Sequence, residues 1–212
     1  MNNPFADVHF AVSALTPRQL PPDRGAEVAF VGRSNAGKSS AINAITGHRG
    51  LARTSKTPGR TRALNVFNLD EHRRLVDLPG FGYARAAKEF KHQWQQALRH
   101  YLERRRSLRG LVLVMDVRRS LAAAEYELLQ WSRQAALPVH ILLTKSDKLG
   151  RAPARAALQQ VASNLLSFRH GVSVQLFSAS RREGVDQTRA VLADWLRLKK
   201  SPGKNKGRKP GA

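Results

Sequence analysis

Residues 32–39 read Gly32-Arg33-Ser34-Asn35-Ala36-Gly37-Lys38-Ser39 and match the pattern G-x-x-x-x-G-K-[ST] of phosphate-binding P-loops. The run at 27–31 (EVAFV) precedes them and is typical of a strand buried on both faces. A helix is predicted to follow at 37–46. Glycines let backbone N–H groups turn toward phosphate oxygens, and the helix N-terminus adds partial positive charge. We therefore expect Lys38 to contact the β- and γ-phosphates of a nucleotide and Ser39 to ligate Mg²⁺.

The rest of the chain alternates between two kinds of hydrophobic pattern. Further strands are predicted at 64–69, 74–78, 111–117, 139–143 and 172–177. Further helices are predicted at 88–107, 121–136, 154–168 and 185–198. This alternation predicts an α/β fold, with a mostly parallel sheet and helices on both faces. Ligands of such sheets bind beyond the carboxyl ends of the strands.

Composition divides the chain into three parts. We expect a nucleotide-binding domain over 24–198, preceded by an N-terminal extension over 1–23. Residues 1–24 are predicted to be irregular, because Pro17, Pro21 and Pro22 mark a loop-rich entry. The end, 199–212, holds six basic residues and no acid, and we expect it to be a disordered tail.

The chain carries 37 lysine and arginine residues against 15 acidic residues, a formal net charge of +22. Such a surplus attracts phosphate backbones over long range. It favours a nucleic acid or nucleoprotein partner over a solvated basic surface or an anionic membrane.

The chain has no cysteine, so disulfides and thiolate metal sites are excluded. It shows no signal-peptide pattern and no apolar run near the ~20 residues that span a bilayer, so we expect a cytoplasmic protein without membrane insertion.

Asp77-Leu78-Pro79-Gly80 stands at the end of the strand predicted over 74–78. An aspartate there can hold Mg²⁺ through a water molecule, and the Gly80 N–H can donate to a γ-phosphate. An aspartate before Pro-Gly is also an ordinary turn residue. Its distance along the chain from the P-loop favours the functional interpretation.

Thr144-Lys145-Ser146-Asp147 follows the strand predicted over 139–143 and resembles the guanine-reading motif [NT]-K-x-D. The Asp147 carboxylate can accept two hydrogen bonds from the N1–H and the exocyclic amine of guanine, a pair that adenine does not offer. Lys145 would lie over the base. Thr144 replaces the commoner asparagine, and its hydroxyl can still tie this loop to the P-loop. After the last strand, Phe177-Ser178-Ala179-Ser180 would supply the Ala179 N–H to the guanine carbonyl.

With these motifs in the standard GTPase order, the details GRSNAGKSS, ARTSKTPGRTRALNVF, RLVDLPGFGYA and LLTKSDKL resemble the EngB (YihA/YsxC) family. This family belongs to the TrmE-Era-EngA-YihA-Septin-like group of GTPases. The resemblance implies a Ras-like P-loop GTPase domain that uses GTP, GDP and Mg²⁺. It also implies a monomeric nucleotide-controlled switch that acts in assembly of the large ribosomal subunit, through rRNA and ribosomal proteins, and in cell division and septation.

The resemblance places the first switch loop on the pattern PGxTR. Thr61 would then be the second Mg²⁺-ligating hydroxyl, with Thr57 as the rival and an ordinary turn cap as the alternative. The segment adds these residues to the GTP-binding set: Gly59, Arg60, Thr61, Arg62 and Ala63.

Phe81 stands where Ras-like proteins have the glutamine that orients the attacking water. The family shares this replacement, so slow intrinsic hydrolysis is implied and no catalytic residue is assigned. Asn35 is a candidate ligand for a K⁺ ion beside the phosphates. The alternative is that Asn35 only suits a left-handed loop conformation.

Two other classes of protein remain as alternatives. The first is a P-loop kinase for a small molecule, for which the TKSD motif has no explanation. The second is an RNA-binding module in which the nucleotide is mainly structural. Binding of GTP against ATP separates the first from a GTPase, and GTP turnover stimulated by ribosomal particles separates the second.

Overall fold

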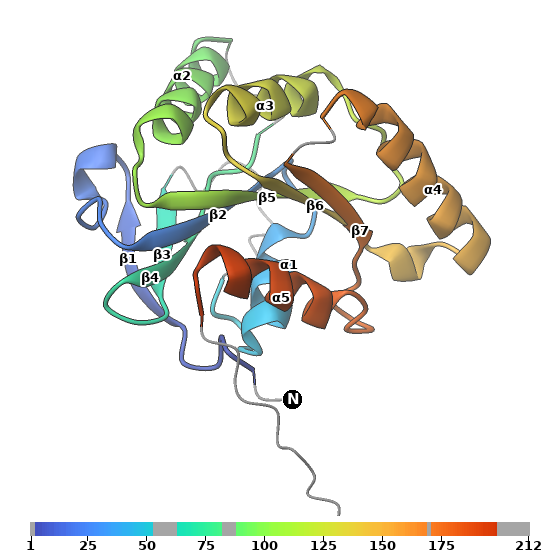
Figure 1. The fold of residues 1–212 in the computed structure, drawn as a ribbon, viewed down its shortest axis with the longest axis horizontal. Helices are drawn as coiled ribbons and strands as arrows, with labels where there is room; N and C mark the ends of the chain where they lie inside the picture. Colours follow the sequence, from blue (N-terminus) through green and yellow to red (C-terminus); the bar gives the residue numbers. More distant parts are fainter. Residues whose placement is uncertain (1–2, 53–62, 82–87, 169–170, 199–212) are drawn as a thin grey trace, which may run out of the picture.

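The computed structural model describes residues 3–52, 63–81, 88–168 and 171–198, and for residues 17 and 88–94 it describes the backbone alone. The expected tail over 199–212 lies outside the described residues. The described residues form a single sheet between two layers of helices (Figure 1). No described helix is long and apolar enough to cross a membrane.

The sheet has seven strands in the order β1-β3-β4-β2-β5-β6-β7. Their bounds are β1 (His9–Ala14), β2 (Ala26–Gly32), β3 (Leu64–Asn68), β4 (Arg73–Asp77), β5 (Leu108–Asp116), β6 (Val139–Thr144) and β7 (Val172–Leu176). Strands β4, β2, β5, β6 and β7 are paired in parallel, whereas β3 runs antiparallel to both β1 and β4. The prediction of a mostly parallel sheet is confirmed.

The helices are α1 (Lys38–Thr46), α2 (Lys88–Arg104), α3 (Ala123–Gln134), α4 (Arg151–Asn164) and α5 (Val185–Trp195). Helices α1 and α5 cover one face of the sheet, and α2, α3 and α4 cover the other (Figure 1). Every predicted helix is present, with ends that differ by a few residues. The largest difference is in α4, which begins at Arg151, and a separate 3-10 turn follows over Leu166–Phe168.

The middle of strand β5, residues 111–115, is apolar at every position. Leu111 and Leu113 pack into the core on the α2–α3–α4 side, whereas Val112 and Val114 pack into the core on the α1–α5 side. Successive side chains of a strand point to opposite faces, so a strand covered on both faces needs apolar residues at every position.

The prediction that residues 1–24 are irregular is wrong for His9–Ala14, which forms β1 at the edge of the sheet. The Ser13 hydroxyl donates a hydrogen bond of 2.6 Å to Asn65 Oδ1 on β3. Phe5 is fully buried ahead of the strand. Most side chains of β1 are exposed, so no hydrophobic alternation marks it in the sequence. Its pairing partner lies far along the chain, which is why local patterns did not reveal it.

Candidate nucleotide-binding site

The P-loop joins the end of β2 to the start of α1, as its sequence predicted. Two of its residues have positive φ, Asn35 at 63° and Gly37 at 95°. This backbone turns back on itself between strand and helix, a conformation that glycine and asparagine adopt at low cost. The Ser34 N–H donates to the Phe81 carbonyl oxygen at 3.2 Å, which holds the loop against the segment after β4.

Close approach requires glycine at position 32 and leaves little room for a side chain at Gly80. A Cβ atom on Gly32 would lie 2.4 Å from the Val114 carbonyl oxygen, a distance that backbone cannot accept. A Cβ on Gly80 would lie 3.3 Å from the Ser34 nitrogen. The DLPG segment therefore lies directly beside the P-loop.

Lys38 and Asp77 meet at the carboxyl ends of β2 and β4. The Lys38 ammonium forms an ion pair with the Asp77 carboxylate, and both side chains are largely buried. Ser39, the next residue of α1, makes no side-chain hydrogen bond with any residue that the structure describes. The two predicted Mg²⁺-site residues in the described chain thus present oxygen atoms, which are the ligands that Mg²⁺ prefers.

The predicted guanine motif begins at the end of β6. The Thr144 hydroxyl donates to the Ala36 carbonyl oxygen in the P-loop and also lies 2.8 Å from the Met115 carbonyl oxygen. The prediction that this threonine ties the motif to the P-loop is confirmed. Lys145 has a φ of 60° and its ammonium donates to the Asn35 carbonyl oxygen at 2.8 Å. Two loops more than a hundred residues apart are therefore joined at two points.

Asp147 lies beside the loop that follows β7. The Ser178 hydroxyl donates to Asp147 Oδ1 at 2.6 Å and lies 3.1 Å from the Ser180 hydroxyl. The hydrogen bond from Ser178 lowers the pKa of the Asp147 carboxyl group. The carboxylate is therefore held as an anion, the form that accepts hydrogen bonds from guanine.

The remaining predicted residues divide into three groups. Phe177 is fully buried, and the Ser146 hydroxyl donates to Glu183 Oε2 at 2.6 Å, so these two residues support the guanine loop. Leu78, Pro79, Ala63 and Ala179 are among the described residues, and no side-chain hydrogen bond joins them to other described residues. Gly59, Arg60, Thr61 and Arg62, together with the rival Thr57, lie outside the described residues.

Sequence reasoning missed Asp116 and Glu125. Asp116 ends β5 and pairs with Lys145 at 3.0 Å and with Arg118 at 2.7 Å. The Arg118 hydrogen bonds lower the pKa of Asp116, with Lys145 adding to the effect. Glu125, near the start of α3, accepts two hydrogen bonds from Arg33 at 2.6 and 3.1 Å. Asp116 could have been found from its place near the carboxyl end of a predicted strand, where ligands of such sheets bind.

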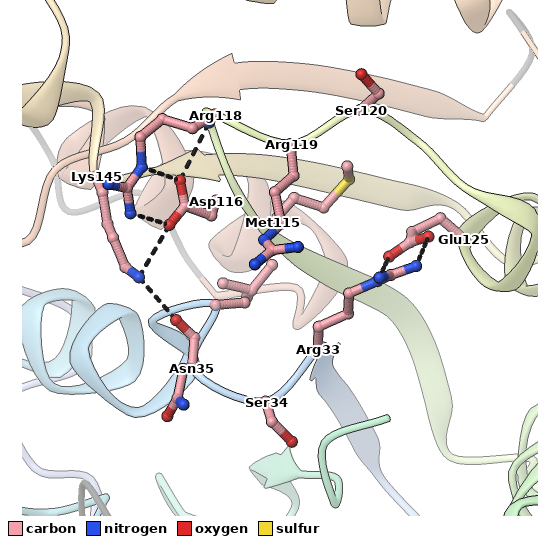
Figure 2. Close-up of a pocket in the computed structure, with 12 residues that line it drawn as sticks. Arg33, Ser34, Asn35, Met115, Asp116, Arg118, Arg119, Ser120, Glu125 and Lys145 are labelled. Carbon is pink, nitrogen blue, oxygen red and sulfur yellow. Dashed lines mark hydrogen bonds and ion pairs between the residues drawn. The ribbon is translucent and has the colours of Figure 1, made fainter. Parts of the chain in front are cut away.

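An open cavity of about 530 Å³ lies beside the P-loop, between it and the segment that joins β5 to α3. Figure 2 shows the Asp116–Arg118–Lys145 contacts on one side of this cavity and the Arg33–Glu125 pair on the other. Both sets of charges adjoin the P-loop, so a change at either can reach the phosphate-binding backbone.

Comparison with known proteins places the chain in a family. A sequence model of the family described as 50S ribosome-binding GTPase matches residues 27–145. The chain is 55% identical over 196 residues to a probable GTP-binding protein EngB of Nitrosococcus oceani, covering 92% of this chain and 98% of that one. It is 49% identical over 193 residues to the corresponding protein of Coxiella burnetii strain CbuG_Q212, covering 91% and 94%.

Solved structures agree on the fold. A crystal structure of a probable GTP-binding protein EngB matches with a TM-score of 0.65 at 24% identity, over 82% of this chain and 100% of that one. A crystal structure of Era with MgGDPNP and part of 16S ribosomal RNA matches with a TM-score of 0.58 at 20% identity, over 84% and 59%. With a family model over half its length and near-complete relatives at about 50% identity, this chain belongs to the EngB family of GTP-binding proteins, within the 50S ribosome-binding GTPases.

Proposed function

We propose that this GTP-binding protein is a nucleotide-controlled switch that acts in assembly of the large ribosomal subunit. The observation that carries the proposal is the junction of the P-loop, the DLPG segment and the TKSD loop at one edge of the sheet. A single bound nucleotide would contact all three. Release of the switch loops on loss of the γ-phosphate is the general mechanism of such proteins.

In this proposal, Asp147 reads guanine and Lys145 covers the base, while the P-loop N–H groups and Lys38 hold the phosphates. The Lys38–Asp77 ion pair keeps the ammonium at the end of β2. A bound γ-phosphate would compete for Lys38 and leave Asp77 to face a metal-bound water. Nucleotide binding would therefore rearrange this pair.

Mg²⁺ would be held by Ser39 and Thr61 directly and by Asp77 through water. The Ser39 hydroxyl has no side-chain partner among the described residues, and the Asp77 carboxylate pairs with the preceding residue, Lys38, so the described oxygen donors fit a hard cation. When bound, Mg²⁺ would supply positive charge against the phosphate oxygens of the nucleotide.

Hydrolysis would be slow without a partner. Phe81, at the position of the water-orienting glutamine, has a side chain that is 7% exposed and packs in the core. It offers no group that can orient water. The Asn35 side chain is exposed and so is available to hold a K⁺ ion. That ion would add positive charge beside the phosphates.

The partner would be the large subunit or its precursor, bound through rRNA and ribosomal proteins. The net charge of +22 supports an RNA-rich target, and the family description names 50S ribosome binding. The protein would act as a cytoplasmic monomer, and its loss would disturb cell division and septation, as the resemblance to the EngB family implies.

Sedimentation of purified large subunits with this protein tests the proposal. We expect co-sedimentation with a non-hydrolysable GTP analogue to exceed that with GDP or without nucleotide, and the particles to stimulate GTP turnover. Equal co-sedimentation in all three conditions, with no stimulation, would instead favour the RNA-binding module in which the nucleotide is structural.

A further inference from the structure

The cavity beside the P-loop adjoins the proposed nucleotide contacts and extends past them to the segment after β5. Its P-loop wall runs from Arg33 to Ala36, and its opposite wall comes from β5 and the segment after it. Of the residues assigned above to the nucleotide, Lys38, Asp77 and Asp147 lie outside the cavity lining, whereas Lys145 and the P-loop residues 33–36 belong to both. It therefore offers a second binding position that shares the P-loop as a common wall.

The charges in the cavity are unbalanced. Four cationic and two anionic side chains line it, a surplus of two positive charges. Arg33 is occupied by Glu125, and Arg118 is occupied by Asp116. The side chain of Arg119 is exposed and has no ion-pair or hydrogen-bond partner among the residues that the structure describes. In Figure 2 its guanidinium extends into the cavity, between Asp116 and the Arg33–Glu125 pair.

A chain of contacts connects this cavity to the nucleotide site. Arg118 donates to both oxygens of Asp116, at 2.9 and 2.7 Å. Asp116 also pairs with Lys145, whose ammonium reaches the Asn35 carbonyl oxygen at 2.8 Å. An anion that drew Arg118 away from Asp116 would strengthen the Asp116–Lys145 pair and so alter the contact between the guanine motif and the P-loop.

We propose that this cavity binds a phosphate group of an RNA backbone, with Arg119 as its principal contact and Arg118 and the exposed Ser120 hydroxyl beside it. The inference rests on the proposed function and adds to it the surface by which RNA is sensed. Guanidinium groups bind phosphate through paired hydrogen bonds, and the cavity is open to solvent.

RNA is favoured over an acidic protein segment by the charge of the whole chain. A net charge of +22 concentrates polyanions near the surface, and a phosphate backbone presents a charge at each nucleotide. Because binding free energies are reciprocal, RNA in the cavity would change nucleotide affinity by the same factor by which nucleotide changes RNA affinity.

The test compares Arg119→Ala with Arg155→Ala, which removes the same charge from an exposed position on α4. Affinity is measured for large ribosomal subunits and for their deproteinised rRNA, with a GTP analogue and with GDP. We expect Arg119→Ala to lose about tenfold in affinity for both probes, as for one charge-assisted contact. The salt slope should also fall by roughly 0.7–0.9. Arg155→Ala should change affinity by less than about twofold, as for a charge without specific contact.

Basal GTP turnover and GDP affinity of Arg119→Ala should match those of the unmodified protein, because Arg119 is outside the nucleotide contacts. Equal losses for Arg119→Ala and Arg155→Ala would overturn the inference, and so would a loss seen with whole subunits and not with deproteinised rRNA. Failure of the unmodified protein to bind subunits at all would instead overturn the proposed function.

Discussion

The hydroxyl of Thr144 donates a hydrogen bond to the carbonyl oxygen of Ala36, joining the guanine motif to the P-loop. The Thr144 side chain is buried and the same hydroxyl also lies 2.8 Å from the Met115 carbonyl oxygen. A threonine at the first motif position therefore fixes the P-loop to both β5 and β6. Its role is positional, since Asp147 carries the proposed contact to the base.

Thr144→Val should lower the free energy of unfolding and weaken GDP binding. Valine keeps the shape of threonine but removes the single O–H that the two buried carbonyl oxygens share, at a cost of about 1–2 kcal/mol. Urea denaturation without nucleotide and GDP titration measure the two effects. Thr144→Ser is the control because it keeps the hydroxyl, and it should bind GDP more tightly than the valine variant. Wild-type affinity in Thr144→Val would refute the positional role.

Asp147→Asn should weaken GTP binding and improve binding of xanthosine triphosphate. The amide offers a donor where guanine also presents a donor, whereas the xanthine oxygen can accept from it. Loss of two hydrogen bonds to a charged group costs about 1.5–3 kcal/mol each. Titrations with both nucleotides measure the exchange of preference. If the variant bound GTP as tightly as the native protein, Asp147 would not be the residue that reads guanine.

GTP turnover should be faster in potassium than in sodium at equal ionic strength. Asn35→Gly tests the side chain more cleanly than Asn35→Ala would. Asn35 has a φ of 63°, and glycine adopts this conformation without strain. The glycine variant should lose most of the potassium effect if the asparagine side chain holds the ion. A potassium effect that persists in Asn35→Gly would leave the residue with its conformational role alone.

His140 should make stability fall in weak acid. Burial lowers the pKa of this imidazole, and its two nitrogens lie 2.7 Å from the Ser173 hydroxyl and 3.0 Å from Gln175 Oε1. A neutral ring satisfies both partners, accepting from the hydroxyl and donating to the amide oxygen. Since the folded pKa lies below the unfolded one, the unfolded chain takes up the proton first. Stability is therefore present above about pH 6.5 and is lost as the pH falls below it.

Urea denaturation of the native protein and of His140→Gln at pH 7.5 and pH 5.5 tests this expectation. Glutamine does not titrate, so the free energy of unfolding of His140→Gln should change less between the two pH values than that of the native protein. The difference between the proteins isolates His140 from the other six histidines. An equal change in both proteins would show that the buried imidazole does not control the pH dependence.

Local sequence patterns were enough to predict the fold class and the chemistry of the main motifs. G-x-x-x-x-G-K-[ST] between a strand and a helix specifies a P-loop through local backbone requirements, and Asn35 and Gly37 have the positive φ values that such a loop needs. The alternation of buried strands and helices predicted the parallel sheet because each strand carries its own local hydrophobic pattern.

The contacts between motifs and the position of β1 depend on how the chain packs in three dimensions. Arg33 and Glu125 are 92 residues apart in sequence, and the residues around each one do not predict that the two side chains meet. Asp116 meets Lys145 because β5 and β6 are adjacent, parallel and in register at their carboxyl ends. An edge strand such as β1 takes its stability from the backbone donors and acceptors of β3, which a pattern of side chains does not record.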